Sequence, residues 1–238
     1  MSEQLENKKK LQFVFEKRKI TNIKGIRVGK ASDVSGSTTS LWENGIMQTN
    51  IDRFFAIADR MDDNHSMDNI LFDNKIYPTV DMTPENYSTF AKDYVLNNNN
   101  IEWGGTIYSL PLDYMHKLWF SNKNKKSNFL SKFLNKNKED EKKEPAFLMF
   151  ETDGECFKHD EKYTDKILEK MSKDPVYIVF IALKAHPSNH FSFIKEMANK
   201  YDHVGIVIVD DIKELTSEKL YEHMITEEVA NWFKKVSE

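Results

Sequence analysis

Apolar residues follow two patterns along this chain, short continuous runs and recurrences every three or four positions. The runs at 146–150, Val176–Leu183 and Val204–Val209 have the length and composition of strands that are buried on both faces of a sheet. The recurrences are typical of amphipathic helices, which we expect over 46–61, 108–120, 162–171, 191–201, 216–224 and 226–236. Because strands and helices alternate, the pattern predicts a mostly parallel sheet covered by helices.

The N-terminal part of the chain is less regular. The run LQFVF at 11–15 is followed by charged residues and predicts a short edge strand within an N-terminal extension, residues 1–24. Small and apolar residues before Asp33 predict the first strand of the main sheet. Two further apolar runs, 67–72 and 75–80, flank a turn-forming Asp-Asn pair and predict a hairpin.

Two segments follow between the hairpin and the strand at 146–150. Thr83 and Pro84 have the residue types of a helix N-cap and first turn, so we expect a helix from there to Leu96. Residues 121–144 contain eight lysines and four acidic residues, which predicts an exposed, charged and partly disordered insertion. The alternative is that its basic face binds a membrane surface or nucleic acid, with the domain as a scaffold.

The expected architecture is a single α/β domain over residues 25–238, Rossmann-like, with a central, mostly parallel sheet flanked by helices on both faces. The net charge of −4 argues against a general nucleic-acid binder. The single cysteine, Cys156, cannot form an intrachain disulfide and is compatible with a reducing compartment. The N-terminal lysines are not followed by the apolar h-region of a secretory signal, and no apolar run is long enough to span a membrane. These features predict a cytoplasmic protein without a transmembrane segment.

A polar motif at the end of the first predicted strand carries the candidate chemistry. Asp33, Ser35 and Ser37 present oxygen atoms at alternate positions, with Gly36 between the serines. Hard divalent cations prefer oxygen ligands of this kind, and Mg²⁺ is usually held by one or two carboxylates and by water.

Two distant residues can complete such a site. Thr106 lies on a Gly-Gly-Thr loop before a predicted helix, and Asp153 directly follows the strand at 146–150. In open parallel sheets, ligands bind beyond the carboxyl ends of the strands, where all of these residues should meet. The sequence therefore predicts one cation site built from three segments.

Other chemistries fit the sequence poorly. The segment GIRVGKAS has three residues between its glycines where a phosphate loop has four, and it lacks the hydroxyl that would follow the lysine. His186 and His190 have no further His or Cys to form a zinc set. Ser35 or Ser37 would need a nearby base to act as a nucleophile, and no motif supplies one.

The order Asp-x-Ser-Gly-Ser, Gly-Gly-Thr and a strand ending in Thr-Asp-Gly resembles the metal-ion-dependent adhesion site (MIDAS) of von Willebrand factor A-type (vWA) domains. The resemblance implies that Asp33, Ser35, Ser37, Thr106 and Asp153 are the metal ligands. It also implies a bound Mg²⁺, with Mn²⁺ or Ca²⁺ as alternatives, and a partner protein whose Asp or Glu completes the coordination.

A narrower resemblance extends over most of the chain. It is to the cytoplasmic vWA proteins of bacterial and phage tellurite-resistance gene clusters, and it rests on LQFVFEK at 11–17, GIRV at 25–28, ADRMDDN at 58–64, WGGTIY at 103–108, TDGE at 152–155 and DDI at 210–212. One departure concerns Lys30, because the first strand of the family is usually uniformly apolar. Lys30 is either an edge effect or a change in the charge of the site.

The function expected from these features is a non-enzymatic, Mg²⁺-dependent protein-interaction module in a tellurite-resistance, stress-response or phage-defence-related assembly. One alternative is a metal-assisted phosphoester hydrolase, for which Glu155 and His159 are the nearest candidate bases in the sequence. The other alternative is the scaffold role described for the insertion.

Overall fold

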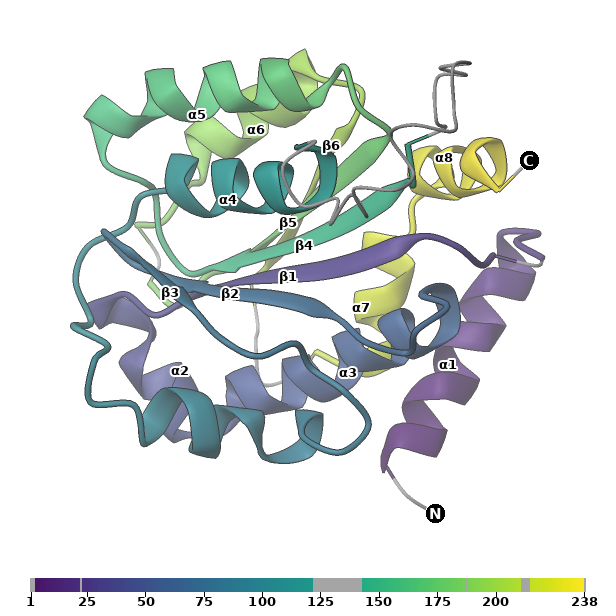
Figure 1. Cartoon of the computed structure of the whole chain (residues 1–238), viewed down its shortest axis with the longest axis horizontal. Coiled ribbons are helices and arrows are strands. Elements are labelled where there is room, and N and C mark those ends of the chain that lie inside the picture. Colours follow the sequence, from purple (N-terminus) through teal and green to yellow (C-terminus); the bar gives the residue numbers. More distant parts are fainter. Residues whose placement is uncertain (1–2, 22, 122–142, 187, 211–214, 238) are drawn as a thin grey trace, which may run out of the picture.

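The computed structural model describes residues 3–21, 23–121, 143–186, 188–210 and 215–237. Within them, six strands form one sheet in the order β3-β2-β1-β4-β5-β6 (Figure 1). The strands are β1 (Arg27–Asp33), β2 (Asp68–Phe72), β3 (Ile76–Pro78), β4 (Ala146–Thr152), β5 (Val176–Leu183) and β6 (Val204–Val209). Only β3 runs antiparallel to its neighbour, β2, so the predicted mostly parallel α/β sheet and the predicted hairpin are confirmed.

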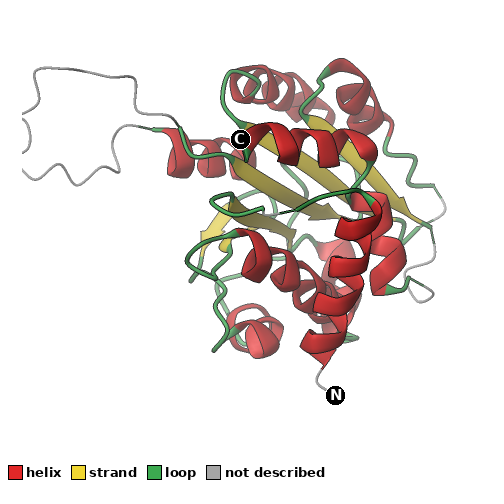
Figure 2. Ribbon diagram, turned by 90° about the vertical axis from the view of Figure 1, so that its right-hand side faces the viewer, coloured by secondary structure: helices red, strands yellow, loops and turns green. Residues whose placement is uncertain are grey.

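Helices cover both faces of the sheet, as Figure 2 shows from the side. The α-helices are α1 (Glu3–Lys17), α2 (Thr39–Glu43), α3 (Ile46–Met61), α4 (Ser109–Phe120), α5 (Lys158–Met171), α6 (Ser192–Lys200), α7 (Ser217–Met224) and α8 (Glu227–Val236). Buried residues of α1, α3, α7 and α8 form one half of the core with one face of the sheet, and those of α4, α5 and α6 form the other half.

The two central strands explain why the sheet was predictable. Every residue of β4 and β5 is buried, because helices lie against both of their faces. On the α4–α6 side, the rings of Phe150 and Phe180 lie 4.7 Å apart between centroids, and Tyr108 lies 5.1 Å from Phe150. Burying each such side chain contributes about 1.5–3 kcal/mol to folding, so continuous apolar runs at these positions follow from the topology.

The predicted edge strand at 11–15 is wrong, because these residues lie in helix α1. Leu11, Val14 and Phe15 are buried at helical spacing, whereas Phe13 is 51% exposed. The buried side chains pack between α3 and α7, and α1 contacts both helices. A strand would have alternated these side chains between two faces, and only the helix places three of them on one face.

The predicted helix from Thr83 to Leu96 is also wrong in its first part. Asn86 accepts a hydrogen bond from the Thr83 amide at 2.8 Å and donates one to the Asp81 carbonyl at 3.0 Å. Such side-chain bonds offer the backbone an alternative to the helix. A turn therefore precedes a short 3₁₀ helix, η2 (Tyr87–Thr89), and a π-helix, η3 (Ala91–Leu96).

The C-terminal helices begin where the sequence predicts. The hydroxyl groups of Thr216 and Thr226 accept hydrogen bonds from the amides of Lys219 and Val229 and cap α7 and α8. Most of the predicted charged insertion, 121–144, lies outside the described residues. No helix among the described ranges is long and apolar enough to cross a membrane.

Candidate metal centre

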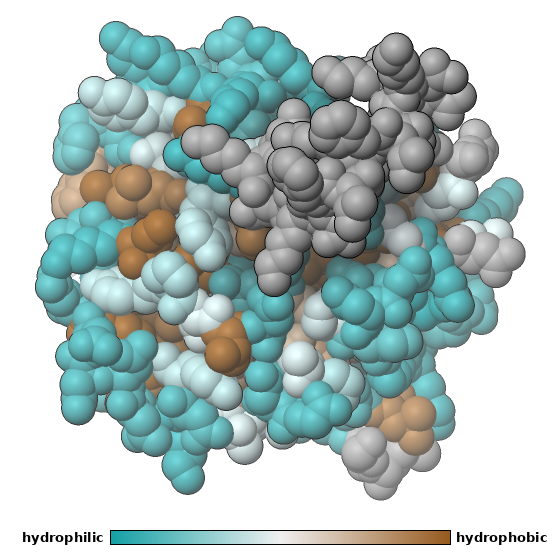
Figure 3. All heavy atoms as spheres, in the orientation of Figure 1, coloured by the Kyte–Doolittle hydropathy of each residue, from teal (hydrophilic) through white to brown (hydrophobic). Residues whose placement is uncertain are grey.

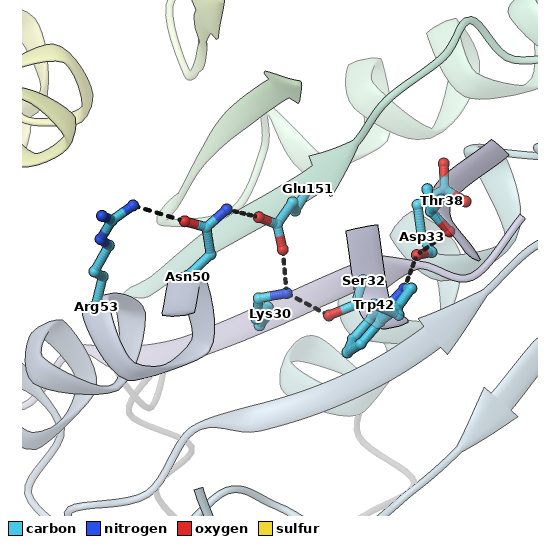
Figure 4. Close-up of polar contacts among 8 residues, drawn as sticks. All are labelled: Lys30, Ser32, Asp33, Thr38, Trp42, Asn50, Arg53 and Glu151. Atoms are coloured by element: carbon cyan, nitrogen blue, oxygen red, sulfur yellow. Dashed lines mark hydrogen bonds and ion pairs between the residues drawn. The ribbon is translucent and has the colours of Figure 1, made fainter. Parts of the chain in front are cut away.

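Asp33 ends β1 in the interior of the sheet and is completely buried. Its Oδ1 atom accepts a hydrogen bond from the Ser35 amide at 2.7 Å, and its Oδ2 atom accepts one from the Thr152 hydroxyl at 2.6 Å. Its carbonyl oxygen accepts bonds from the Trp42 indole at 2.9 Å and the Thr38 hydroxyl at 3.1 Å (Figure 4). The carboxylate is therefore held in one orientation at the carboxyl end of the strand.

The next polar side chains of the motif, Ser35 and Ser37, lie near Asp153, which belongs to the loop after β4. Ser35 and Ser37 lie with their hydroxyl oxygens 3.2 Å apart, and Ser37 donates a hydrogen bond to Asp153 Oδ1 at 2.7 Å. Both loops follow adjacent parallel strands, β1 and β4, which is why residues 116 positions apart in the chain make this contact.

Thr106 lies on the third loop, which is tied to the first by a backbone hydrogen bond from Gly36 to the Gly104 carbonyl at 2.9 Å. The threonine is buried, and its carbonyl accepts the Phe157 amide at 3.1 Å. The structure thus brings all three predicted segments to one end of the sheet.

Asp73 anchors the Thr106 loop. The sequence predicts only a turn at this residue, so its contact with the site is a finding of the structure. Its Oδ2 atom accepts hydrogen bonds from the Gly104 amide at 2.8 Å and the Tyr77 hydroxyl at 2.9 Å, and its carbonyl accepts the Ile107 amide at 3.0 Å. The available signal was its position directly after β2, one residue beyond the register partner of Asp33.

Replacing Asp73 with alanine should lower the free energy of unfolding by about 2–4 kcal/mol, because the amides of Gly104 and Lys75 lose their buried acceptor. Urea unfolding measures this. Asp210→Ala is the matched control, since Asp210 also follows a strand but is exposed and, among the described residues, pairs with Lys184. It should change stability by less than about 0.5 kcal/mol. A loss below about 1 kcal/mol for Asp73→Ala would show that the loop does not depend on this anchor.

The two carboxylates of the site are poorly solvated. Burial raises the pKa of Asp33 to about 7, although hydrogen bonds from Ser35 and Thr152 oppose the change, and the neighbouring charge of Asp153 adds to it. Burial also raises the pKa of Asp153, against the hydrogen bond from Ser37. A cation between two such groups would relieve both penalties.

One atom supports such a cation directly. Asp153 Oδ2 is buried and has no hydrogen-bond partner among the described residues, and a buried carboxylate oxygen without a donor is costly. The surrounding donors are carboxylate and hydroxyl oxygens, which suit a hard cation. No group of three or more His, Cys, Asp and Glu side chains in the described ranges is arranged to hold a metal. The oxygen atoms of Asp33, Ser35, Ser37 and Asp153 fit an oxygen-bound divalent ion, and the loop of the fifth predicted ligand, Thr106, lies at the same end of the sheet.

Candidate bases and a thiol near the site have other contacts. Glu155 accepts the Ser192 amide at 2.6 Å, and the His159 ring stacks on Phe157 with centroids 5.5 Å apart. Cys156 is buried, and burial raises the pKa of its thiol well above the usual range. His186 bonds to Ser188.

Lys30 is not an edge effect, because β1 is an interior strand and the side chain is completely buried. Its Nζ atom lies 2.6 Å from Glu151 Oε2. Burial lowers the pKa of Lys30, and the charge of Glu151 opposes this change. The lysine thus belongs to a buried ion pair beneath the site.

Comparisons with known proteins identify the family of this chain. Residues 25–238 match the model of a family described as the vWA found in the TerF C terminus. The uncharacterized protein YcbR of Bacillus subtilis (strain 168) is 26% identical over 235 residues, which is 97% of this chain and 86% of YcbR.

Solved structures of proximal thread matrix protein 1 from the mussel byssus share the fold. Two of them superpose with TM-scores of 0.52 and 0.53 at 13% and 12% identity and cover 87% of this chain. The match covers 48% of those chains, so the chain spans about half their length. One of the mussel structures has a zinc-occupied MIDAS motif.

Proposed function

Because this chain belongs to the family of vWA domains found in the TerF C terminus, we propose that it is a non-enzymatic, Mg²⁺-dependent module that binds a partner protein through an Asp or Glu side chain. The observation that carries this proposal is the buried Oδ2 atom of Asp153, which has no hydrogen-bond partner in the part of the chain that the structure describes. Asp33 and Asp153 supply negative charge, directly or through water, and Ser35, Ser37 and Thr106 supply neutral oxygens. An ion with so few charged ligands still attracts a carboxylate.

Magnesium is the preferred ion because all five proposed ligands are oxygens, and hard oxygen donors suit Mg²⁺, with Mn²⁺ and Ca²⁺ as competitors. The zinc in the MIDAS motif of the mussel protein supports a divalent ion in this fold. The TerF name of the family supports a role in tellurite resistance or a related stress response.

The surface around the site suits a protein partner. Phe157, beside the Thr106 loop, is 44% exposed, and Leu110 at the start of α4 is 39% exposed. Figure 3 shows hydrophobic side chains on the left of the molecule, over the start of α4 and the nearby loops. Exposed apolar surface beside a polar site is typical of interaction surfaces.

Mg²⁺ should stabilise the folded protein, because the unfolded chain does not bring the three ligand segments together. At one hundred times the dissociation constant, the ion should add about 2.7 kcal/mol to the free energy of unfolding. Thermal unfolding with EDTA, Mg²⁺, Mn²⁺ or Ca²⁺ measures this and ranks the ions. The Asp153→Ala variant is the control and should show no response; a wild-type melting temperature that no ion changes would refute the metal site.

The partner is tested by capture from a cell lysate with and without Mg²⁺, using wild type and Asp33→Ala. We expect the same carboxylate-bearing partner to be captured only by wild type and only with the metal. The hydrolase alternative predicts instead that wild type cleaves phosphoesters and that Asp33→Ala does not. The backbone hydrogen bond that Glu155 accepts from Ser192 favours the binding function over a role of Glu155 as a base.

A further inference from the structure

A chain of hydrogen-bonded polar side chains, all buried except the partly buried Arg53, runs next to the metal site from β1 through Glu151 of β4 to helix α3 (Figure 4). Lys30 Nζ contacts Glu151 Oε2 at 2.6 Å and donates to the Ser32 hydroxyl at 2.5 Å. Asn50 of α3 donates to Glu151 Oε1 at 2.6 Å, and Arg53 donates to Asn50 Oδ1 at 3.0 Å. Both oxygens of the buried glutamate are therefore bound, one by the sheet and one by a helix.

The members of this chain lie next to the proposed ligands in sequence and in space. Ser32 precedes Asp33, and Glu151 is followed by Thr152 and Asp153. Ser32 and Glu151 are also register partners across the β1–β4 pair. The ion pair thus joins the two strands close to their carboxylate ligands, with Lys30 three residues before Asp33 and Glu151 two residues before Asp153.

Helix α3 completes the arrangement. The loop that carries Ser35 and Ser37 begins at the end of β1 and leads through α2 into α3. Asn50 connects α3 to Glu151 by a hydrogen bond. Glu151 therefore contacts the chain on both sides of this loop, through Lys30 before it and Asn50 after it. Glu151 itself lies on β4, the strand that leads to Asp153.

Stability does not explain this arrangement. Both side chains of the pair are completely buried and lie among apolar residues, including the ring of Phe54, 5.5 Å from Lys30 Nζ. Replacing such a pair with apolar residues of similar volume is often neutral or stabilising, because removing two charges from water is costly. A directional contact, in contrast, fixes the relative position of the elements that it joins.

We propose that Lys30 and Glu151 are positioning residues of the metal site, which hold the ends of β1, β4 and α3 so that Asp33 and Asp153 converge before the cation binds. This inference rests on the proposed metal-binding function. The proposal gives a role to Lys30, the charged residue in a strand that the family resemblance predicts to be apolar.

The test is the double variant Lys30→Met/Glu151→Met, with Mn²⁺ affinity measured by calorimetry and stability by urea unfolding. We expect folding at least as stable as that of wild type and Mn²⁺ binding weaker by about 10- to 100-fold, the usual effect of losing the groups that orient metal ligands. Asn50→Ala, which keeps the ion pair but releases Glu151 from α3, should weaken binding in the same direction and provides the test if the double variant does not fold.

Asp174→Asn is the matched control, because Asp174 pairs with His116 at 2.7 Å and lies before β5, at the amino ends of the parallel strands and away from the site at their carboxyl ends. It should lower stability and leave Mn²⁺ affinity unchanged. Wild-type affinity in the double variant, or in Asn50→Ala where only that variant folds, would overturn the positioning role while leaving the metal site intact. Absence of Mn²⁺ binding by wild type would overturn both proposals.

Discussion

The Asp33→Asn variant should be more stable than wild type without metal at pH 8 and should no longer respond to Mg²⁺. In the folded protein, burial raises the pKa of Asp33 to about 7 from the usual 3.8. Between pH 3.8 and pH 7, the folded state keeps a proton on Asp33 that the unfolded state has released. The free energy of unfolding therefore falls as the pH rises through this range and levels off above pH 7. Each pKa unit is equivalent to about 1.4 kcal/mol, so a pKa difference of roughly 3 between the folded and unfolded states lowers the free energy of unfolding by about 4 kcal/mol at pH 8.

Asparagine avoids this cost because it is neutral at every pH in the range. Its carbonyl oxygen can still accept the Ser35 amide, and the Thr152 hydroxyl can rotate to accept from the new amide group. The variant loses, however, one of two carboxylates in the proposed ligand set. Residues that serve a metal are therefore expected to destabilise the metal-free protein, as is common at functional sites.

Urea unfolding in EDTA at pH 5, 6, 7 and 8 measures the effect. The stability difference between Asp33→Asn and wild type should be about 1.5 kcal/mol at pH 5, increase to about 4 kcal/mol near pH 7 and change little from there to pH 8. Comparison at each pH removes the contributions of other titrating groups, among them Asp52 and Asp68, whose pKa values burial raises to about 6. A difference that does not change with pH would mean that Asp33 is ionised in the folded protein throughout this range.

The sheet was predictable because its inner strands are buried on both faces and read as continuous apolar runs. The site was predictable because parallel strands place their carboxyl ends together, so three motifs far apart in the chain had one place to meet. Helix α1 was not predictable, because LQFVF fits a strand as well as a helix. Only the contacts of Leu11, Val14 and Phe15 with other helices decide between them.

The supporting residues of the site were harder to predict than the proposed ligands. Thr152 donates a hydrogen bond to Asp33, and Asp73 accepts from the amides of Gly104 and Ile107 in the Thr106 loop. Position at the end of a strand is the one sequence signal that either residue offers. Lys30 and Glu151 did leave a signal. Each is the one charged residue in the interior of an otherwise small or apolar strand, and a buried charge requires a partner of opposite sign. Two such strands therefore predict each other as neighbours.

Replacing Lys30 alone with methionine should be among the most damaging single substitutions, with a loss of about 3–5 kcal/mol of stability. The loss arises because Glu151 keeps its burial but loses its only cation among the described residues within salt-bridge distance. Asn50 still donates to Oε1, yet a neutral donor replaces little of the interaction with a full charge.

The double variant Lys30→Met/Glu151→Met separates the cost of an unpaired charge from the value of the pair. We expect it to recover the stability lost in Lys30→Met, giving a coupling energy of several kcal/mol in the double-mutant cycle. Urea unfolding of wild type, both single variants and the double variant measures this cycle. If Lys30→Met and the double variant were equally unstable, packing around Lys30 would account for the loss and the ion pair would not. If instead the double variant is stable, a decrease in its metal affinity cannot be attributed to partial unfolding, and the pair must act on the site through position.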